Sequence, residues 1–268
     1  MYKDPPAMET ARKTTTFAAL KERIRHLERL GGALGRTAGK AHAKAVPLLP
    51  VLDRLWPEKG LPLGCLHEAG SDGSLAGAAA LTAFAAAIAG RLGMVLWCSQ
   101  RTDAHGAGFY APGLAQVGLA PSRLLAATAA ADADVLAVME EGLRHPVLDC
   151  VVGEVERLNL TASRRLHLAA EKSGVTAFIL RTPCRRGQAA PITAASRWRI
   201  TVMPSSPHAI PEAGRARWRL ELLRSRSGAT GHWIVEAPDA QGYLRLPSPL
   251  ADGFTQAPAA VEQRLAAG

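Results

Sequence analysis

The spacing of hydrophobic and polar positions between residues 46 and 181 predicts strands that alternate with helices. Apolar runs that predict strands lie at residues 61–70, 94–99, 148–155 and 175–181. Longer segments that predict helices lie at 75–92, 132–144 and 161–174, with Asp132 and Thr161 as the expected N-terminal caps. Strands that alternate with helices of ten or more residues favour right-handed crossovers, so we expect a mostly parallel central sheet.

The pattern changes in the last third of the chain, where three runs predict strands with no helix between them. These runs cover residues 196–202, 215–223 and 232–237, and the glycine-containing turn at 228–231 predicts a hairpin between the last two. Alternation along the middle run places polar side chains on one face and apolar ones on the other: Arg215, Arg217, Arg219 and Glu221 against Trp218, Leu220 and Leu222. We therefore expect antiparallel strands at this end, with one arginine-studded face.

A separate amphipathic helix is predicted near the N-terminus, at residues 16–30. One apolar stripe runs along it, formed by Phe17, Leu20, Ile24 and Leu27, and Gly31 and Gly32 are expected to stop it before a linker. The stripe could pack on the core of the same chain, on a second copy or on a partner, and the sequence leaves these alternatives open. The expected organisation is a helix and linker at 1–45, a core at 46–246 and a disordered tail at 247–268, which is rich in Pro, Ala, Gly and Ser.

The net charge of +9 is concentrated in one part of the chain of 268 residues. Ten arginines and two glutamates lie between Arg181 and Arg226, which gives +8. A basic stretch of this density suits a polyanion or an acidic partner, although solvated strand faces would have the same composition.

Several observations favour a cytoplasmic protein with no metal site. The N-terminus has no apolar segment of the kind that directs secretion, and the longest apolar stretch, 76–89, is alanine-rich and predicts a buried helix. No CxxC pair and no HExxH motif occurs, so we interpret the cysteines as reduced core residues: Cys65, Cys98, Cys150 and Cys184.

The glycine-rich segment at residues 67–81 lies where an α/β nucleotide-binding protein keeps its phosphate-binding loop. Gly70, Gly73 and Gly77 allow a tight turn, and Ser71 or Asp72 could cap the following helix. No lysine lies between residues 59 and 172, so the cation that would neutralise the phosphates is missing, and Asp72 adds negative charge. We interpret the loop as a structural turn, with weak nucleotide binding as the alternative.

Four separated segments resemble the ImuA family, which comprises RecA-related bacterial proteins linked to DNA-damage-induced mutagenesis. In chain order they are LPLGCLHEAG, FYAPGLAQVGL, LDCVVGEVERLNLTASRRLHLAAEKSGVTAFILRTP and RWRLELLRSR. The resemblance covers residues 20–246 and implies a RecA-like α/β core of the P-loop-NTPase type, with a mostly parallel central sheet, antiparallel C-terminal strands and an N-terminal helix.

The same segments are similar to RecA recombinases, and the comparison implies that the parts for ATP hydrolysis are lost. Gln100 stands where RecA has its catalytic glutamate, and an amide cannot act as a general base. Glu154 replaces the Walker B aspartate, and Thr182 replaces the nucleotide-sensing glutamine. Arg185 and Arg186 lie in the position of the second DNA-binding loop. Arg224 and Arg226 match a basic pair that reaches across a RecA subunit interface.

The family resemblance implies an accessory protein that needs no cofactor and acts in translesion synthesis during the SOS response. Its expected partner is an ImuB-like relative of the Y-family polymerases, and through it an error-prone DnaE-type polymerase. RecA, single-stranded DNA and a second copy of the chain are further candidate partners. The residues expected to contact DNA or an acidic partner are Arg185, Arg186, Arg197 and Arg199. Trp198, beside them, is either a base-stacking residue or part of the core, and its parity with Ile200 favours the core.

Two other functions stay open. The chain could be a RecA-like DNA-dependent ATPase if an arginine from elsewhere replaced the missing lysine. It could also be a SulA-type inhibitor of cell division, because those proteins are RecA-like and lack the ATPase parts.

Overall fold

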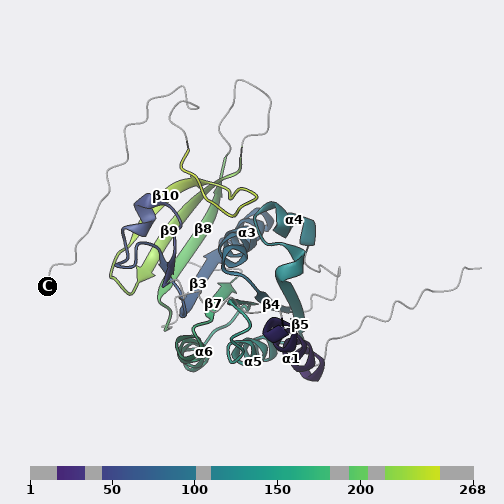
Figure 1. Cartoon of the computed structure of the whole chain (residues 1–268). Coiled ribbons are helices and arrows are strands. Elements are labelled where there is room, and N and C mark those ends of the chain that lie inside the picture. The colour runs from purple at the N-terminus through teal and green to yellow at the C-terminus, as the bar shows by residue number, and fades with distance from the viewer. Residues whose placement is uncertain (1–16, 34–43, 101–109, 182–192, 205–214, 248–268) are drawn as a thin grey trace, which may run out of the picture.

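A computed structural model describes residues 17–33, 44–100, 110–181, 193–204 and 215–247, which form a mixed α/β fold around a large sheet (Figure 1). Within these residues the sheet has eight strands in the order β10-β9-β8-β3-β7-β6-β4-β5, and β1 (Ala45–Val46) pairs separately with β2 (Leu61–Pro62). The strands are β3 (Leu66–Ser71), β4 (Val95–Gln100), β5 (Leu124–Ala129), β6 (Cys150–Glu154), β7 (Thr176–Arg181), β8 (Ser196–Met203), β9 (Arg217–Ser225) and β10 (Gly231–Glu236). The first six of these are parallel, and β9 and β10 are antiparallel, as the sequence predicted.

The helices cover the two faces of this sheet unequally. They are α1 (Phe17–Ala33), α2 (Pro50–Asp53), α3 (Leu75–Leu92), α4 (Ala111–Gln116), α5 (Asp132–Gly142) and α6 (Leu160–Ser173), with a 3-10 turn at Pro121–Arg123. In Figure 1, α1, α5 and α6 lie in a row on one face, and α3 lies on the other. None of the described helices packs closely on β9 or β10 on the side of α1, α5 and α6.

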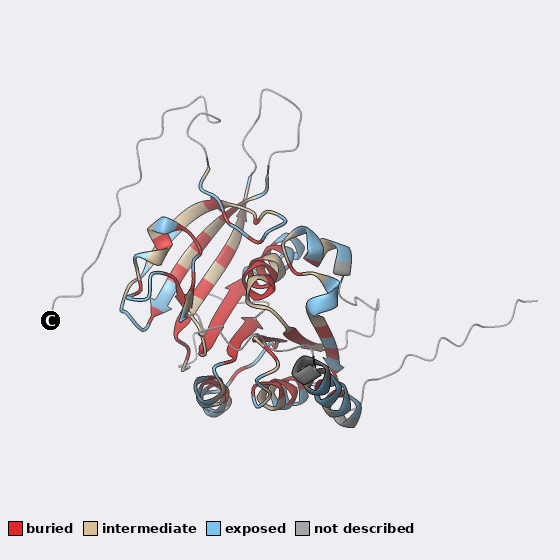
Figure 2. Ribbon diagram, viewed as in Figure 1, coloured by how far each residue is buried: buried red, intermediate tan, exposed pale blue. Residues whose placement is uncertain are grey.

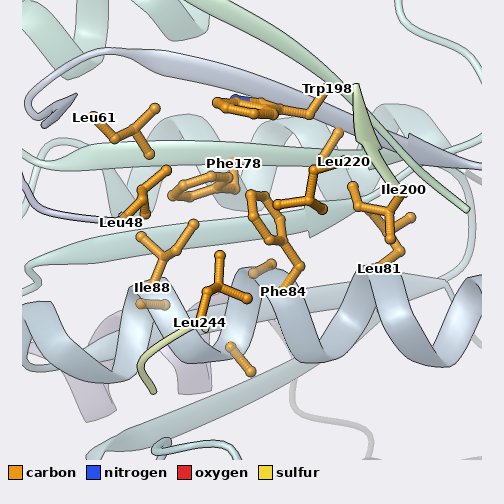
Figure 3. Packing of buried hydrophobic residues seen from close by; sticks show 14 of the residues in the cluster. Leu48, Leu61, Leu81, Phe84, Ile88, Phe178, Trp198, Ile200, Leu220 and Leu244 are labelled. Carbon is orange, nitrogen blue, oxygen red and sulfur yellow. The ribbon is translucent and has the colours of Figure 1, made fainter. Parts of the chain in front are cut away.

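Helix α3 is the centre of the larger core. By length and composition it could cross a membrane, but 56% of its 18 residues is buried inside the fold, which is what a core helix requires. Its alanines let the helix approach the sheet closely, and Phe84 packs against Trp198 with ring centroids 5.8 Å apart (Figure 3). Trp198 is fully buried, so its predicted place in the core is confirmed.

Burial alternates along β8 and β9, where buried and half-buried residues follow one another (Figure 2). Trp218, Leu220 and Leu222 face α3, and the residues between them face the other side. This confirms the arginine-studded face predicted for the middle strand.

Several predicted helix boundaries were wrong. Helix α1 continues through Gly31 and Gly32 to Ala33. Asp132 is the first residue of α5 rather than its cap. The side chain of Asn159, not that of Thr161, caps α6 by accepting from Ala162 N at 2.8 Å. In the last two cases the helix begins one or two residues before the position that we assigned.

Candidate functional site

The loop between β3 and α3 is closed by its own side chains. Ser74 is the N-terminal cap of α3, and its hydroxyl accepts from Gly77 N at 2.9 Å. The carboxylate of Asp72 accepts from Ser74 N at 3.0 Å and from Ser74 Oγ at 2.8 Å. Gly73 has a φ of 86°, which suits glycine. Ser71 is buried, its hydroxyl has no partner among the described residues, and it does not cap the helix.

Asp72 therefore places a negative charge at the positive end of α3. Its two hydrogen bonds from Ser74 lower the pKa of the Asp72 carboxyl below its ordinary value, so it is ionised at neutral pH. An ideal Cβ on Gly77 would lie 2.2 Å from Asp72 Oδ1, which shows how closely the carboxylate covers the first turn. A phosphate at this place would meet that carboxylate, and the described residues of the loop offer no lysine or arginine.

The polar residues at the ends of β4 and β6 are engaged in the fold. Gln100 Nε2 donates to the carboxylate of Asp132, which also accepts from the backbone N–H groups of Glu156 and Arg157. Glu154 Oε1 accepts from Trp97 Nε1 at 2.8 Å. Burial raises the pKa of Glu154, and the bond from Trp97 acts in the opposite direction. Both side chains thus hold neighbouring elements together.

Glu68, within β3, joins this strand to its two neighbours in the sheet, β7 and β8. Glu68 is buried and accepts from Arg181 Nη1 on β7 at 3.1 Å and from Arg197 Nε on β8. Arg197 lies directly opposite Glu68 in the register of β3 and β8. Sequence reasoning missed this ion network, because Glu68 looks like an ordinary polar position in an apolar strand.

The two described arginines expected to contact DNA or an acidic partner are partly committed to such internal pairs. Arg197 pairs with Glu68, and Arg199 Nη1 lies 3.5 Å from Glu221 Oε2. Arg219 Nε lies 3.2 Å from the other oxygen of Glu221. Their role in binding stays a prediction. Thr182, Arg185 and Arg186 lie outside the described residues, as does Cys184.

The predicted interface residues contact the same chain where the structure describes them. Leu20 is 2% exposed and Ile24 is fully buried, in a cluster with residues of β5, α5 and α6. Lys21 pairs with Glu141 of α5 at 3.1 Å, so α1 is fixed by charge as well. The side chains of Phe17 and Leu27 lie outside the described part of the chain. While α1 is docked in this way, Leu20 and Ile24 offer no surface to a partner.

The second predicted interface pair, Arg224 and Arg226, lies at the end of β9. Arg226 Nη2 donates to Glu171 of α6 at 2.9 Å, and Arg224 is exposed. Arg226 therefore already has a partner within its own chain. Whether either residue reaches a second subunit stays a prediction.

A buried polar network at the amino-terminal ends of β3 and β8 was not predicted. Ser196 Oγ accepts from Trp198 Nε1 at 2.8 Å and lies 2.7 Å from His67 Nδ1, while His67 Nε2 lies 2.8 Å from Pro62 O. All these contacts are satisfied if the hydroxyl donates to Nδ1 and the N–H on Nε2 donates to the carbonyl. Burial lowers the pKa of His67 to about 4, so the ring is neutral at physiological pH.

Two buried cysteines, Cys65 beside this network and Cys98 on β4, are poor nucleophiles. Burial raises the pKa of Cys65 and of Cys98 to about 12, which keeps both thiols protonated. Across the described ranges, no three His, Cys, Asp or Glu side chains come together in a way that could hold a metal ion.

Comparison with known proteins gives a clear relative. The chain is 36% identical over 223 residues to Protein ImuA of Caulobacter vibrioides strain NA1000 / CB15N, an alignment that covers 76% of this chain and 88% of the relative. The match to Protein ImuA of strain ATCC 19089 / CIP 103742 / CB 15 has the same values. No family model matches the chain.

Proposed function

The chain belongs to the ImuA family, and from this premise we propose that it is a non-catalytic accessory protein in DNA-damage-induced mutagenic translesion synthesis. It acts by binding an ImuB-like polymerase homologue, and through that partner it serves an error-prone DnaE-type polymerase. RecA and single-stranded DNA are further candidate partners. Its place of action is the cytoplasm, and the three described cysteines, all free and buried, are compatible with a reducing compartment.

The arrangement of the sheet supports a RecA-like core for this proposal. The segments that resemble RecA around its nucleotide end at the carboxyl ends of β3, β4, β6 and β7. In the sheet these four strands are neighbours, in the order β3-β7-β6-β4, and all are parallel. The positions that RecA uses for nucleotide chemistry are thus brought to one edge, which is also where ligands bind in open α/β sheets.

The observation that carries the non-catalytic part is the position of Asp72. A carboxylate that accepts two hydrogen bonds from Ser74 and covers Gly77 takes the place that a phosphate would need at the end of α3. Charge-assisted contacts contribute about 1.5–3 kcal/mol each, and here the nearest charge has the wrong sign. Gln100 and Glu154 support this argument, because each is held by an internal hydrogen bond.

Two measurements on the intact purified chain test the proposal together. The first is a pull-down against the ImuB-like partner, RecA and single-stranded DNA in parallel, for which we expect capture of the ImuB-like protein. The second is phosphate release from ATP with and without DNA, for which we expect no turnover above that of a Glu154→Gln variant. DNA-stimulated turnover that this variant abolishes would establish the ATPase alternative. If the chain does not capture the ImuB-like protein, and cells that overexpress it form filaments, it would instead be an inhibitor of cell division.

A further inference from the structure

An open pocket of about 570 Å³ lies beside the carboxyl end of α3, at the other end of this helix from Asp72. Its walls come from the last turn of α3, the short turn that contains Arg123, the segment around Pro47 and the segment that follows β10. These parts are far apart in sequence, so the pocket exists only in the folded chain. Its volume falls within the ordinary range for pockets that bind small molecules or single residues of a polymer.

The wall of the pocket is built with little freedom to move. A Cβ on Gly118 would lie 2.8 Å from Gly242 N, and one on Gly242 would lie 2.6 Å from Ala87 O of α3. The carboxylate of Asp239 accepts from the backbone N–H groups of Gln241 and Tyr243 at 3.1 and 3.0 Å. This turn holds Gln241 and Tyr243 in place, and Leu244, labelled beside α3 in Figure 3, anchors the segment in the core.

The charge of the pocket is positive, because Arg91 and Arg123 line it and no described carboxylate does. Arg91 Nη1 donates to Pro47 O at 2.6 Å, and Arg123 Nη1 donates to Gly90 O at 3.3 Å. Each of these bonds uses one N–H of a guanidinium that carries five. Because both arginines line the pocket, each has further donors for a ligand, and a planar guanidinium matches the oxygens of a phosphate.

An aromatic surface stands next to these cations. The guanidinium of Arg91 lies over one face of the Tyr243 ring, 4.2 Å from its centroid, and Tyr243 is 50% exposed. An exposed ring beside arginines is the combination that proteins use to stack a base while the backbone phosphate is neutralised. The amide of Gln241, also on the wall, adds a donor and an acceptor for a base edge.

We propose that this pocket binds one nucleotide unit, with its phosphate at Arg91 and Arg123 and its base against Tyr243. The unit belongs to a bound single strand, a choice that rests on the proposed work of this protein beside DNA. A free mononucleotide offers the same chemistry and is distinguished by the experiment.

The experiment measures fluorescence anisotropy of a labelled thymidine oligomer of about 20 nucleotides with the intact chain, at low and at raised salt. We expect Arg123→Ala and Tyr243→Ala each to weaken binding about tenfold, and Tyr243→Phe, which keeps the ring, to bind as the unchanged protein does. Arg164→Ala is the matched control. It removes the same charge from an exposed position on α6, on the other face of the sheet, and is expected to change binding less than twofold.

Two further measurements show whether the bound nucleotide is free or part of a strand, and whether a variant binds weakly only because it is unfolded. Thymidine monophosphate added as a competitor displaces the oligomer if the pocket prefers a free nucleotide. If thymidine monophosphate does not displace the oligomer, and the variants still weaken oligomer binding, the pocket binds a nucleotide of a strand. Thermal melting identifies unfolded variants, and Arg123→Lys serves if Arg123→Ala unfolds, because it keeps the charge but loses the fork and is expected to bind more weakly.

Oligomer binding that Arg123→Ala and Tyr243→Ala change no more than Arg164→Ala does would overturn the assignment. So would the absence of binding of either probe to the unchanged protein. Capture of the ImuB-like partner is measured on the same preparations. A chain that captures this partner but binds no nucleotide would refute the pocket and leave the proposed function standing.

Discussion

The carboxylate of Asp72 covers Gly77 so closely that a methyl group on Gly77 would lie 2.2 Å from Asp72 Oδ1. The two residues are five positions apart, and the turn at Gly73 and the cap at Ser74 bring them together. As long as position 72 is an aspartate in this conformation, position 77 therefore has room only for glycine.

A double-mutant cycle tests this dependence. Alanine favours a helix over glycine by roughly 1 kcal/mol, so Gly77→Ala should stabilise an Asp72→Ala protein by up to about that amount. In the protein with Asp72 the same change displaces the carboxylate, and we expect that benefit to be lost or reversed. Urea unfolding of the four proteins gives the coupling free energy. Purely additive effects would show that Asp72 does not contact Gly77.

The assignment of the helix cap leads to opposite expectations for two neighbouring serines. Ser74→Ala removes the acceptor for Gly77 N, and the free energy of unfolding should fall by about 1 kcal/mol. Ser71→Ala removes a buried hydroxyl that has no partner within the described residues, so its effect should be close to zero or stabilising. Chemical denaturation of both variants checks this. If Ser71→Ala is the more damaging change, the assignment is wrong.

The fold could be predicted from sequence where burial sets the pattern. Helix α3 was predicted with the bounds that the structure has, since only Thr82 and Arg91 interrupt its run of apolar residues and glycines. The three C-terminal strands were predicted to within two residues at each end. Charged and apolar residues alternate along much of β8 and β9, which made these two strands visible in the sequence. Strand β5 (Leu124–Ala129) was missed, because alanine is uncommon in strands and three of its six residues are alanine.

The candidate site could be predicted only in part. The loss of the lysine and the presence of Asp72 are visible in the sequence, but the cap was assigned to the wrong residues because Ser71, Asp72 and Ser74 are all competent. The ion network of Glu68 and the pocket at Arg91 and Arg123 join segments that lie more than thirty residues apart. No local spacing indicates such contacts.

Acid should destabilise the protein through His67. Its pKa is about 4 in the fold and about 6.5 in an unfolded chain, so between these values the unfolded chain binds more protons. The stabilisation is complete above pH 6.5 and is lost as the pH falls towards 4, by up to about 3 kcal/mol.

The contribution of His67 can be isolated by substitution. We expect His67→Gln to flatten the fall in stability between pH 6.5 and 4, whereas His232→Gln, at an exposed position, should leave it unchanged. The free energy of unfolding by urea, measured at several pH values, gives both slopes. Burial also lowers the pKa of His167, which acts in the same direction, while the raised pKa of Glu154 opposes it. A slope that His67→Gln does not change would assign the acid sensitivity to other groups with a lowered pKa, such as His167.

The docking of α1 on its own chain gives a stability prediction. Ile24 is fully buried, so Ile24→Ala should lower the free energy of unfolding by about 2–4 kcal/mol. Arg25→Ala, one residue further and exposed, should change it by less than about 0.5 kcal/mol. Denaturant unfolding measures both, and sedimentation velocity shows whether the association state changes. A change of association state at unchanged stability would mean that Ile24 lies between copies.

A loop that supplies its own anion has no need of one from solution. We therefore expect this loop to keep one conformation whether ATP is present or absent.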